Sequence, residues 1–149
     1  MENKFFLHRI RKDNGVYNKG IEVHDTLDAA IQAFHSQMKM AYGNSAYPNT
    51  TFVSCMVTDE EDKIVADYNE TWNITNDSNF FLHYIRHDGE TYTKGIDVYD
   101  NYGDACRNFH AQMEYGYGNS KYPNVSFTAT KITGNSGWAH KSEAWTKKE

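Results

Sequence analysis

The sequence predicts an α+β fold made of two copies of one ββαββ unit, each an antiparallel sheet with one helix. The first observation is an internal repeat. Shifting the sequence by 75 positions aligns residues 5–57 with residues 80–132 without a gap, and 26 of the 53 pairs are identical. The second is composition: eleven Tyr, eight Phe and three Trp suit the half-buried surfaces of sheets. We therefore predict a tandem duplication.

The bounds of the two repeats within the chain follow from this alignment. We expect a first repeat at residues 1–73, a linker at 74–79 and a second repeat at 80–149, because the stretch NITNDS at 73–78 is polar and rich in turn formers. A unit of about 70 residues is marginal alone. We expect the two units to pack about a pseudo-twofold axis, with a continuous eight-stranded sheet or a homodimer as alternatives.

Each repeat begins with a predicted hairpin, at residues 4–12 and 16–24 in the first copy. Asn14-Gly15 is typical of a type I′ turn, and Gly89-Glu90 in the second copy suits type II′. Alternate residues of a strand share a face. One face then carries Phe6, His8, Ile10 and Lys19, and the other carries Phe5, Leu7, Arg9 and Arg11. We expect the helix to cover the His8 face.

A helix follows at residues 26–42, with Asp25 and Asp100 expected as N-caps. Helical spacing predicts one inward stripe, formed by Ala30, Phe34, Gln37, Met38 and Ala41. Gly43 and Gly118 fit the position just after the helix, where a left-handed backbone is favourable. Two more strands are expected at 50–58 and 63–72, with the acidic run at 59–62 as the turn between them.

The loop after the helix is written almost identically twice, as AYGNSAYPN at 41–49 and GYGNSKYPN at 116–124. Gly and Pro are explained by the end of the helix. Ser45, Tyr47 and Asn49 are not, and they either hold the loop through hydrogen bonds or present a surface.

Charge and composition exclude several function classes. A net charge of −5 argues against nucleic-acid binding through a basic patch. No apolar run is long enough to span a membrane, and the N-terminus lacks the apolar segment of a signal peptide, so we expect a cytoplasmic protein. Cys55 and Cys106 occupy non-equivalent positions of the two copies, which does not indicate a disulfide framework.

Catalytic and cofactor motifs are not found in the sequence. Neither Ser45 nor Ser120 has a G-x-S-x-G setting, and the glycine of the repeated loop follows a helix, where the dipole repels phosphate. The gap between His8 and His35 matches no familiar metal-ligand spacing. We therefore expect a protein that is not an enzyme and carries no cofactor.

Binding residues can still be proposed from the repeated polar and aromatic positions. In one interpretation His8 is a hydrogen-bonded core residue and Lys19 lies at a sheet edge. In the other, these residues line a pocket between helix and sheet that holds a small anionic or nucleotide-like ligand in symmetric sites. The candidates are His8, Arg11, Lys19, His35 and Tyr47 in the first copy, and His83, Arg86, Lys94, His110 and Tyr122 in the second.

The alternative function is that of a protein–protein interaction module or an inhibitor that uses aromatic surface at Tyr47, Tyr122 and Trp138. A homo-oligomer is a separate alternative. The stretches KGIEVHD, AFHSQM and YGNS resemble small uncharacterised proteins of Gram-positive bacteria and their phages. This resemblance implies an accessory or host-takeover protein that sequesters a signal molecule or blocks a host defence protein. It implies no role for any single residue.

Overall fold

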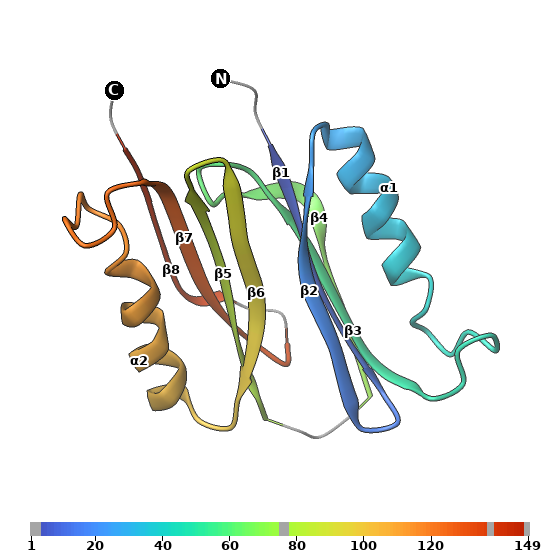
Figure 1. The fold of residues 1–149 in the computed structure, drawn as a ribbon. Helices are drawn as coiled ribbons and strands as arrows, with labels where there is room; N and C mark the ends of the chain where they lie inside the picture. The colour runs from blue at the N-terminus through green and yellow to red at the C-terminus, as the bar shows by residue number, and fades with distance from the viewer. Residues whose placement is uncertain (1–3, 75–77, 137–138, 148–149) are drawn as a thin grey trace. The chain divides into compact units, whose positions relative to one another are not determined.

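The computed structural model describes residues 4–74, 78–136 and 139–147. These residues form two compact units, the first of residues 4–74 with 135–136 and the second of residues 78–134 with 139–147. The predicted fold class is confirmed, since each unit is a four-stranded antiparallel sheet with one helix on one face (Figure 1). The strand orders, β2-β1-β3-β4 and β6-β5-β7-β8, are the same in both units. The first repeat comprises β1 (Phe5–Asp13), β2 (Val16–His24), α1 (Leu27–Met38), β3 (Thr50–Thr58) and β4 (Ile64–Asn73). The second repeat comprises β5 (Phe80–Asp88), β6 (Thr91–Tyr99), α2 (Tyr102–Met113), β7 (Val125–Gly134) and β8 (Ala139–Thr146).

The first hairpin of each repeat has the predicted register, with β1 paired from Phe5 opposite His24 to Asp13 opposite Val16. Asn14 and Gly15 both have positive φ, as a type I′ turn requires, whereas only Gly89 does so in the second hairpin. The predicted linker includes residues 75–77, which lie outside the described residues.

The helix packs on the face of the sheet that was not predicted to receive it. Leu7, Phe34 and Val53 belong to one buried cluster, and their equivalents Leu82 and Phe109 do so in the second repeat. His8 therefore lies on the opposite face, together with Lys19. The prediction failed because β3 is buried at successive positions, so both faces of the sheet read as apolar and alternation alone could not distinguish them.

Four of the five residues predicted for the inward stripe are buried, Ala30, Phe34, Met38 and Ala41, whereas Gln37 is half-buried. The helix start was wrong by one residue. Thr26 and Asn101 are the N-caps, and each accepts a hydrogen bond from the backbone three residues later. Asp25 instead makes an ion pair with Lys4 at 2.6 Å.

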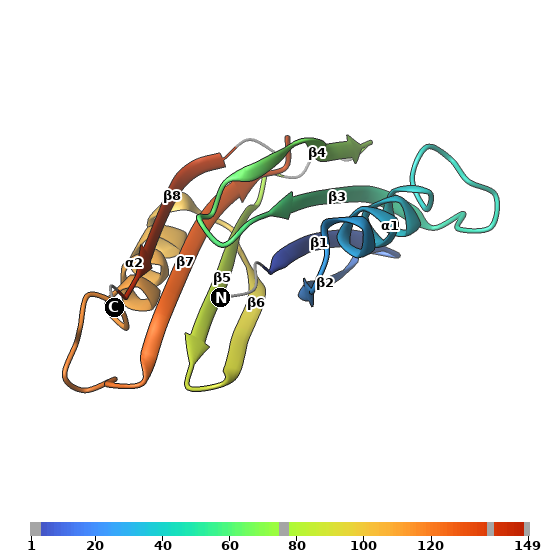
Figure 2. The same cartoon turned by 90° about the horizontal axis from the view of Figure 1, so that it is seen from above.

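The predicted helix end was also wrong, because α1 stops at Met38 rather than near residue 42. The chain then tightens into shorter i→i−3 hydrogen bonds, with Met40 N donating to the Gln37 carbonyl and Ala41 N to the Met38 carbonyl. Gly43 does have positive φ, but it follows Tyr42, which has positive φ too. Figure 2 shows the loop after each helix extending beyond the end of its own sheet.

Candidate functional site

Two of the four candidate histidines, His8 and His83, are core residues. His8 and His83 are each 2% exposed, and the Nε2 atom of each lies 2.8 Å from a threonine hydroxyl, that of Thr58 or Thr133. Burial, with a smaller repulsion from Lys131, lowers the pKa of His83 to about 3. This supports the structural interpretation of both residues.

The predicted pocket between helix and sheet is not formed by the residues assigned to it. Lys19 and Lys94 are exposed, and each pairs across the strands with an isoleucine on the face away from the helix. His35 and His110 are exposed residues of the helices. Because His8 and Lys19 lie on the face of the sheet away from the helix that carries His35, the three residues cannot hold one ligand within a repeat.

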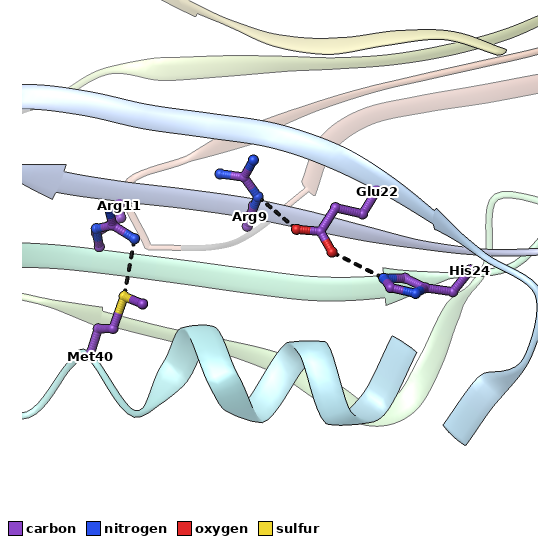
Figure 3. Close-up of polar contacts among 5 residues, drawn as sticks. All are labelled: Arg9, Arg11, Glu22, His24 and Met40. Carbon is purple, nitrogen blue, oxygen red and sulfur yellow. Dashed lines mark hydrogen bonds and ion pairs between the residues drawn. The ribbon is translucent and has the colours of Figure 1, made fainter. Parts of the chain in front are cut away.

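Arg11 lies on the helix-bearing face and is fixed by two neighbours. Its Nε atom donates to Asp13 at 2.5 Å. Its Nη1 atom lies 3.0 Å from the Met40 sulfur (Figure 3). Partial burial alone would raise the pKa of Asp13, but hydrogen bonds from Thr50 and Arg11 outweigh it and hold this pKa below its usual value. Asp13 is therefore charged at neutral pH and orients the guanidinium.

Arg9 is a second arginine on the same face, and it was not among the predicted site residues. Its Nε atom donates to Glu22 at 3.0 Å, and the other oxygen of Glu22 lies 3.1 Å from Nε2 of His24 (Figure 3). The guanidinium lies over Gly20, its cross-strand partner, where an added Cβ would come within 3.1 Å of Nη2. The signal in the sequence was an arginine two positions before Arg11 and opposite a glycine.

Arg9 and Arg11, which we call the arginine pair, are consecutive side chains on one face of β1. Such positions are about 7 Å apart along a strand. Each Nε is held by a carboxylate, while both terminal nitrogens of Arg9 and Nη2 of Arg11 have no hydrogen-bond partner within the described part of the chain. The pair presents oriented, unused donors on a half-buried surface.

The second repeat has no equivalent pair. Tyr84 replaces Arg9, and burial together with nearby Asp97 raises its pKa. Arg86 lies 4.0 Å over the ring of Tyr115, which in turn lies 4.4 Å from the ring of Tyr122. Arg86 and Tyr122 are thus the two predicted residues that the structure brings into one cluster, linked by a tyrosine that the sequence analysis did not select.

A second kind of site occurs in both repeats, and we call it the Tyr–Glu–Trp cluster. In the first repeat Tyr42 donates its hydroxyl hydrogen bond to Glu70 and its ring lies 5.9 Å from that of Trp72. The second repeat has the same arrangement, with a ring distance of 5.8 Å, formed by Tyr117, Glu143 and Trp145. The recurrence of Glu and Trp near the end of each repeat could have indicated it.

The repeated loop is held mainly by Asn44 and its equivalent Asn119. The Asn44 side chain donates to the Lys39 carbonyl at 2.7 Å and accepts from Ala46 N at 2.9 Å. Asn119 makes the same two bonds. Tyr47 N donates to the Asn44 carbonyl, so this loop is built by local hydrogen bonds. Trp138, expected as an interaction residue, lies outside the described residues.

Three further features were searched for in the described residues: a metal site, a membrane-spanning helix and a reactive cysteine. Among them no group of three or more His, Cys, Asp or Glu could hold a metal ion, and no helix is long and apolar enough to cross a membrane. Burial raises the pKa of the Cys55 thiol to about 12, which suppresses the reactive thiolate.

Comparisons with protein-family models, curated proteins and solved structures give no match to this chain. Any assignment of function therefore comes from the geometry of the arginine pair and of the Tyr–Glu–Trp clusters.

Proposed function

We propose that this protein binds a small anion without transforming it, and that the arginine pair of the first repeat is the binding site. One observation carries this proposal: Arg9 and Arg11 share a face, and each is fixed through Nε by a carboxylate, while both terminal nitrogens of Arg9 and Nη2 of Arg11 have no partner among the described residues. Such a site would serve the sequestration of a small signal molecule that the sequence resemblance implies.

The chemistry of the guanidinium selects the class of ligand. Its planar fork of N–H donors matches the oxygens of phosphate and carboxylate groups, and these charge-assisted bonds are stronger than neutral ones. Two such groups about 7 Å apart can share one tetrahedral anion or two linked ones. Because Glu22 and Asp13 already hold Arg9 and Arg11 in place, little side-chain entropy remains to be lost on binding.

Charge limits the size of the ligand. Glu22 and Asp13 offset the two positive charges of the arginine pair, and the whole chain carries −5. Long polyanions are repelled by such a surface, so binding depends on directed donors at one point. This supports a small phosphate or carboxylate compound rather than nucleic acid.

The site is expected once per chain rather than twice. The position of Arg9 is taken by Tyr84 in the second repeat, and the guanidinium of Arg86 stacks on Tyr115. The sequence analysis expected symmetric sites that include Lys19 and Arg11, but these two residues lie on opposite faces of their sheet. We therefore propose a single asymmetric site.

Calorimetric titration of the full chain with inorganic phosphate and with diphosphate tests the proposal. We expect one site per chain. The Arg9→Tyr variant places in the first repeat the residue that the second repeat carries above its own glycine, so it should fold. It should weaken binding at least about tenfold, because a hydrogen bond to a charged group contributes roughly 1.5–3 kcal/mol.

The control is Lys19→Gln, which removes an exposed cation on the opposite face and should leave the affinity unchanged. Undiminished phosphate binding by Arg9→Tyr, or equal loss in Lys19→Gln, would rule out the arginine pair as the site. Binding of two anions per chain would contradict the single-site proposal.

A further inference from the structure

The Tyr–Glu–Trp clusters lie outside the arginine pair and are present in both repeats, so they carry an inference independent of anion binding. Glu70 and Trp72 come from β4, paired with Cys55 and Val53 of β3. Both side chains therefore rise on the helix-bearing face of the sheet. Tyr42 reaches them from the loop after α1, and the second repeat assembles its cluster from the equivalent elements.

The tyrosines are held in an unfavourable backbone conformation with their rings exposed. Tyr42 and Tyr117 both have φ of 60°, and their exposed fractions are 60% and 59%. A left-handed backbone costs a residue other than glycine roughly 1–2 kcal/mol. Because both tyrosines are exposed, burial of their side chains does not explain why they adopt this conformation. Strain of this kind, kept at the same place twice, is typical of positions that serve binding.

The cluster fixes the ring at both ends. The hydroxyl of Tyr42 is tied to one carboxylate oxygen of Glu70, and the ring is tilted by 49° against Trp72. The second oxygen of Glu70 has no partner within residues 4–74, 78–136 and 139–147, and the same holds for Glu143. Each repeat thus offers an exposed tyrosine ring, next to a half-buried tryptophan, beside one unused carboxylate oxygen.

We propose that each Tyr–Glu–Trp cluster binds a cationic side chain, Lys or Arg, from a basic segment of a partner protein. Aromatic faces attract cations through their quadrupole, and a carboxylate adds a charge-assisted hydrogen bond. The net charge of −5 draws a basic partner toward the chain. A single exposed site of this kind binds weakly, with a dissociation constant on the order of 1 mM.

The test follows the indole N–H signals of Trp72 and Trp145 by NMR while the full chain is titrated with acetyl-Gly-Lys-Gly-amide. The arginine peptide is a second probe and the glutamate peptide is the control. The lysine and arginine peptides should shift both signals to saturation at millimolar concentrations. Equal shifts with the glutamate peptide, or none with the cationic peptides, would overturn the proposal.

Variants at one repeat use the other repeat as an internal control. Glu70→Gln keeps an oxygen that can accept from Tyr42 but removes the charge. It should weaken binding at Trp72 about threefold to fivefold, the effect of an exposed charge pair, and leave Trp145 unchanged. Tyr42→Gly relieves the strained backbone, so it should fold and lose the response at Trp72. Full binding at Trp72 in both variants would also overturn the proposal.

Discussion

The two repeats have the same backbone fold and core packing but differ in the side chains on the surface of their first hairpins. Register, helix packing and the histidine–threonine hydrogen bond are the same in both. The first hairpin, however, carries a charged row on its helix-bearing face, whereas the second carries an aromatic one. Within the hairpin the changes are Arg9 to Tyr84 and His24 to Tyr99, and in the segment after the helix Met40 is replaced by Tyr115.

This difference separates what the fold needs from what the surface can vary. Position 9 or 84 stands opposite a glycine, so a long guanidinium or a large ring can occupy the space above it without changing the strands. The Tyr–Glu–Trp cluster was not varied in this way. We therefore propose anion binding in one repeat and cation binding in both.

The largest expected effect tests whether the two repeats have equivalent cores, by removing the central helix side chain from each repeat in turn. Phe34 and Phe109 are at most 1% exposed, so replacing either with Ala should destabilise its unit by about 3–5 kcal/mol. The two losses should agree within about 1 kcal/mol, because the ring contact of Phe34 with Tyr68 and the cation contact of Lys141 with Phe109 have similar strengths. Urea denaturation measures both.

A much smaller loss in one repeat would show that the repeats do not rely on the same core. Ser36→Ala on the exposed side of α1 is the control, since the second repeat already has Ala at this position. It should change stability by less than about 0.5 kcal/mol.

Acid should destabilise the second repeat through His83. Its pKa is about 3 in the folded chain, while an unfolded histidine titrates near 6.5. The unfolded state therefore takes up a proton first as pH falls, and stability is lost between about pH 6.5 and pH 3. From pH 6.5 to pH 5 the loss is about 2 kcal/mol. Urea denaturation at several pH values should show this slope, and His83→Gln should remove it.

The residue paired with the buried histidine differs between the repeats: Lys131 lies beside His83, whereas Met56 lies beside His8. Lys131→Met removes the repulsion that adds to burial in lowering the pKa of His83. The acid-induced loss should then end at a higher pH than in the unchanged chain. An unchanged pH profile in His83→Gln would show that other groups cause the acid sensitivity.

Most of the fold could be predicted because its signals are local. The repeat, Asn14-Gly15 and the spacing of Phe34 and Met38 each act within a few residues, and all are confirmed. The face that receives the helix is a tertiary property. Because β3 is buried on both sides, nothing in its sequence favoured one face over the other.

The candidate site was harder to predict, because it depends on which side chains point the same way. Arg11 was selected as a candidate site residue, and it lies on the same face of the sheet as Arg9, whereas Lys19 and His8 lie on the opposite face. Arg9 was passed over because the second repeat lacks it, and sequence reasoning gave weight to shared positions. Glu70 could be recognised as a site residue only from the structure, in which the loop after α1 brings the Tyr42 hydroxyl within hydrogen-bond distance of it.

The smallest expected effect concerns the two glycines that face the varied position. A Cβ at Gly95 would lie 2.7 Å from the Tyr84 hydroxyl and 3.0 Å from the ring carbon that bears it, whereas at Gly20 it would lie 3.1 Å from the end of Arg9. The rigid ring cannot yield as a guanidinium can. Gly95→Ala should therefore cost about 1 kcal/mol. Gly20→Ala should stay within about 0.5 kcal/mol of neutral, because the less flexible unfolded chain offsets the contact.

Gly20→Ala should nevertheless weaken phosphate binding, because Arg9 must move away from the position in which Glu22 holds it. Gly95→Ala should leave phosphate binding unchanged. Urea denaturation should therefore show the larger loss of stability for Gly95→Ala, in the second repeat. Calorimetry should show the larger loss of phosphate affinity for Gly20→Ala, in the first repeat. The same order in both measurements would mean that the hairpins are functionally equivalent, and the distinction drawn between the repeats would fail.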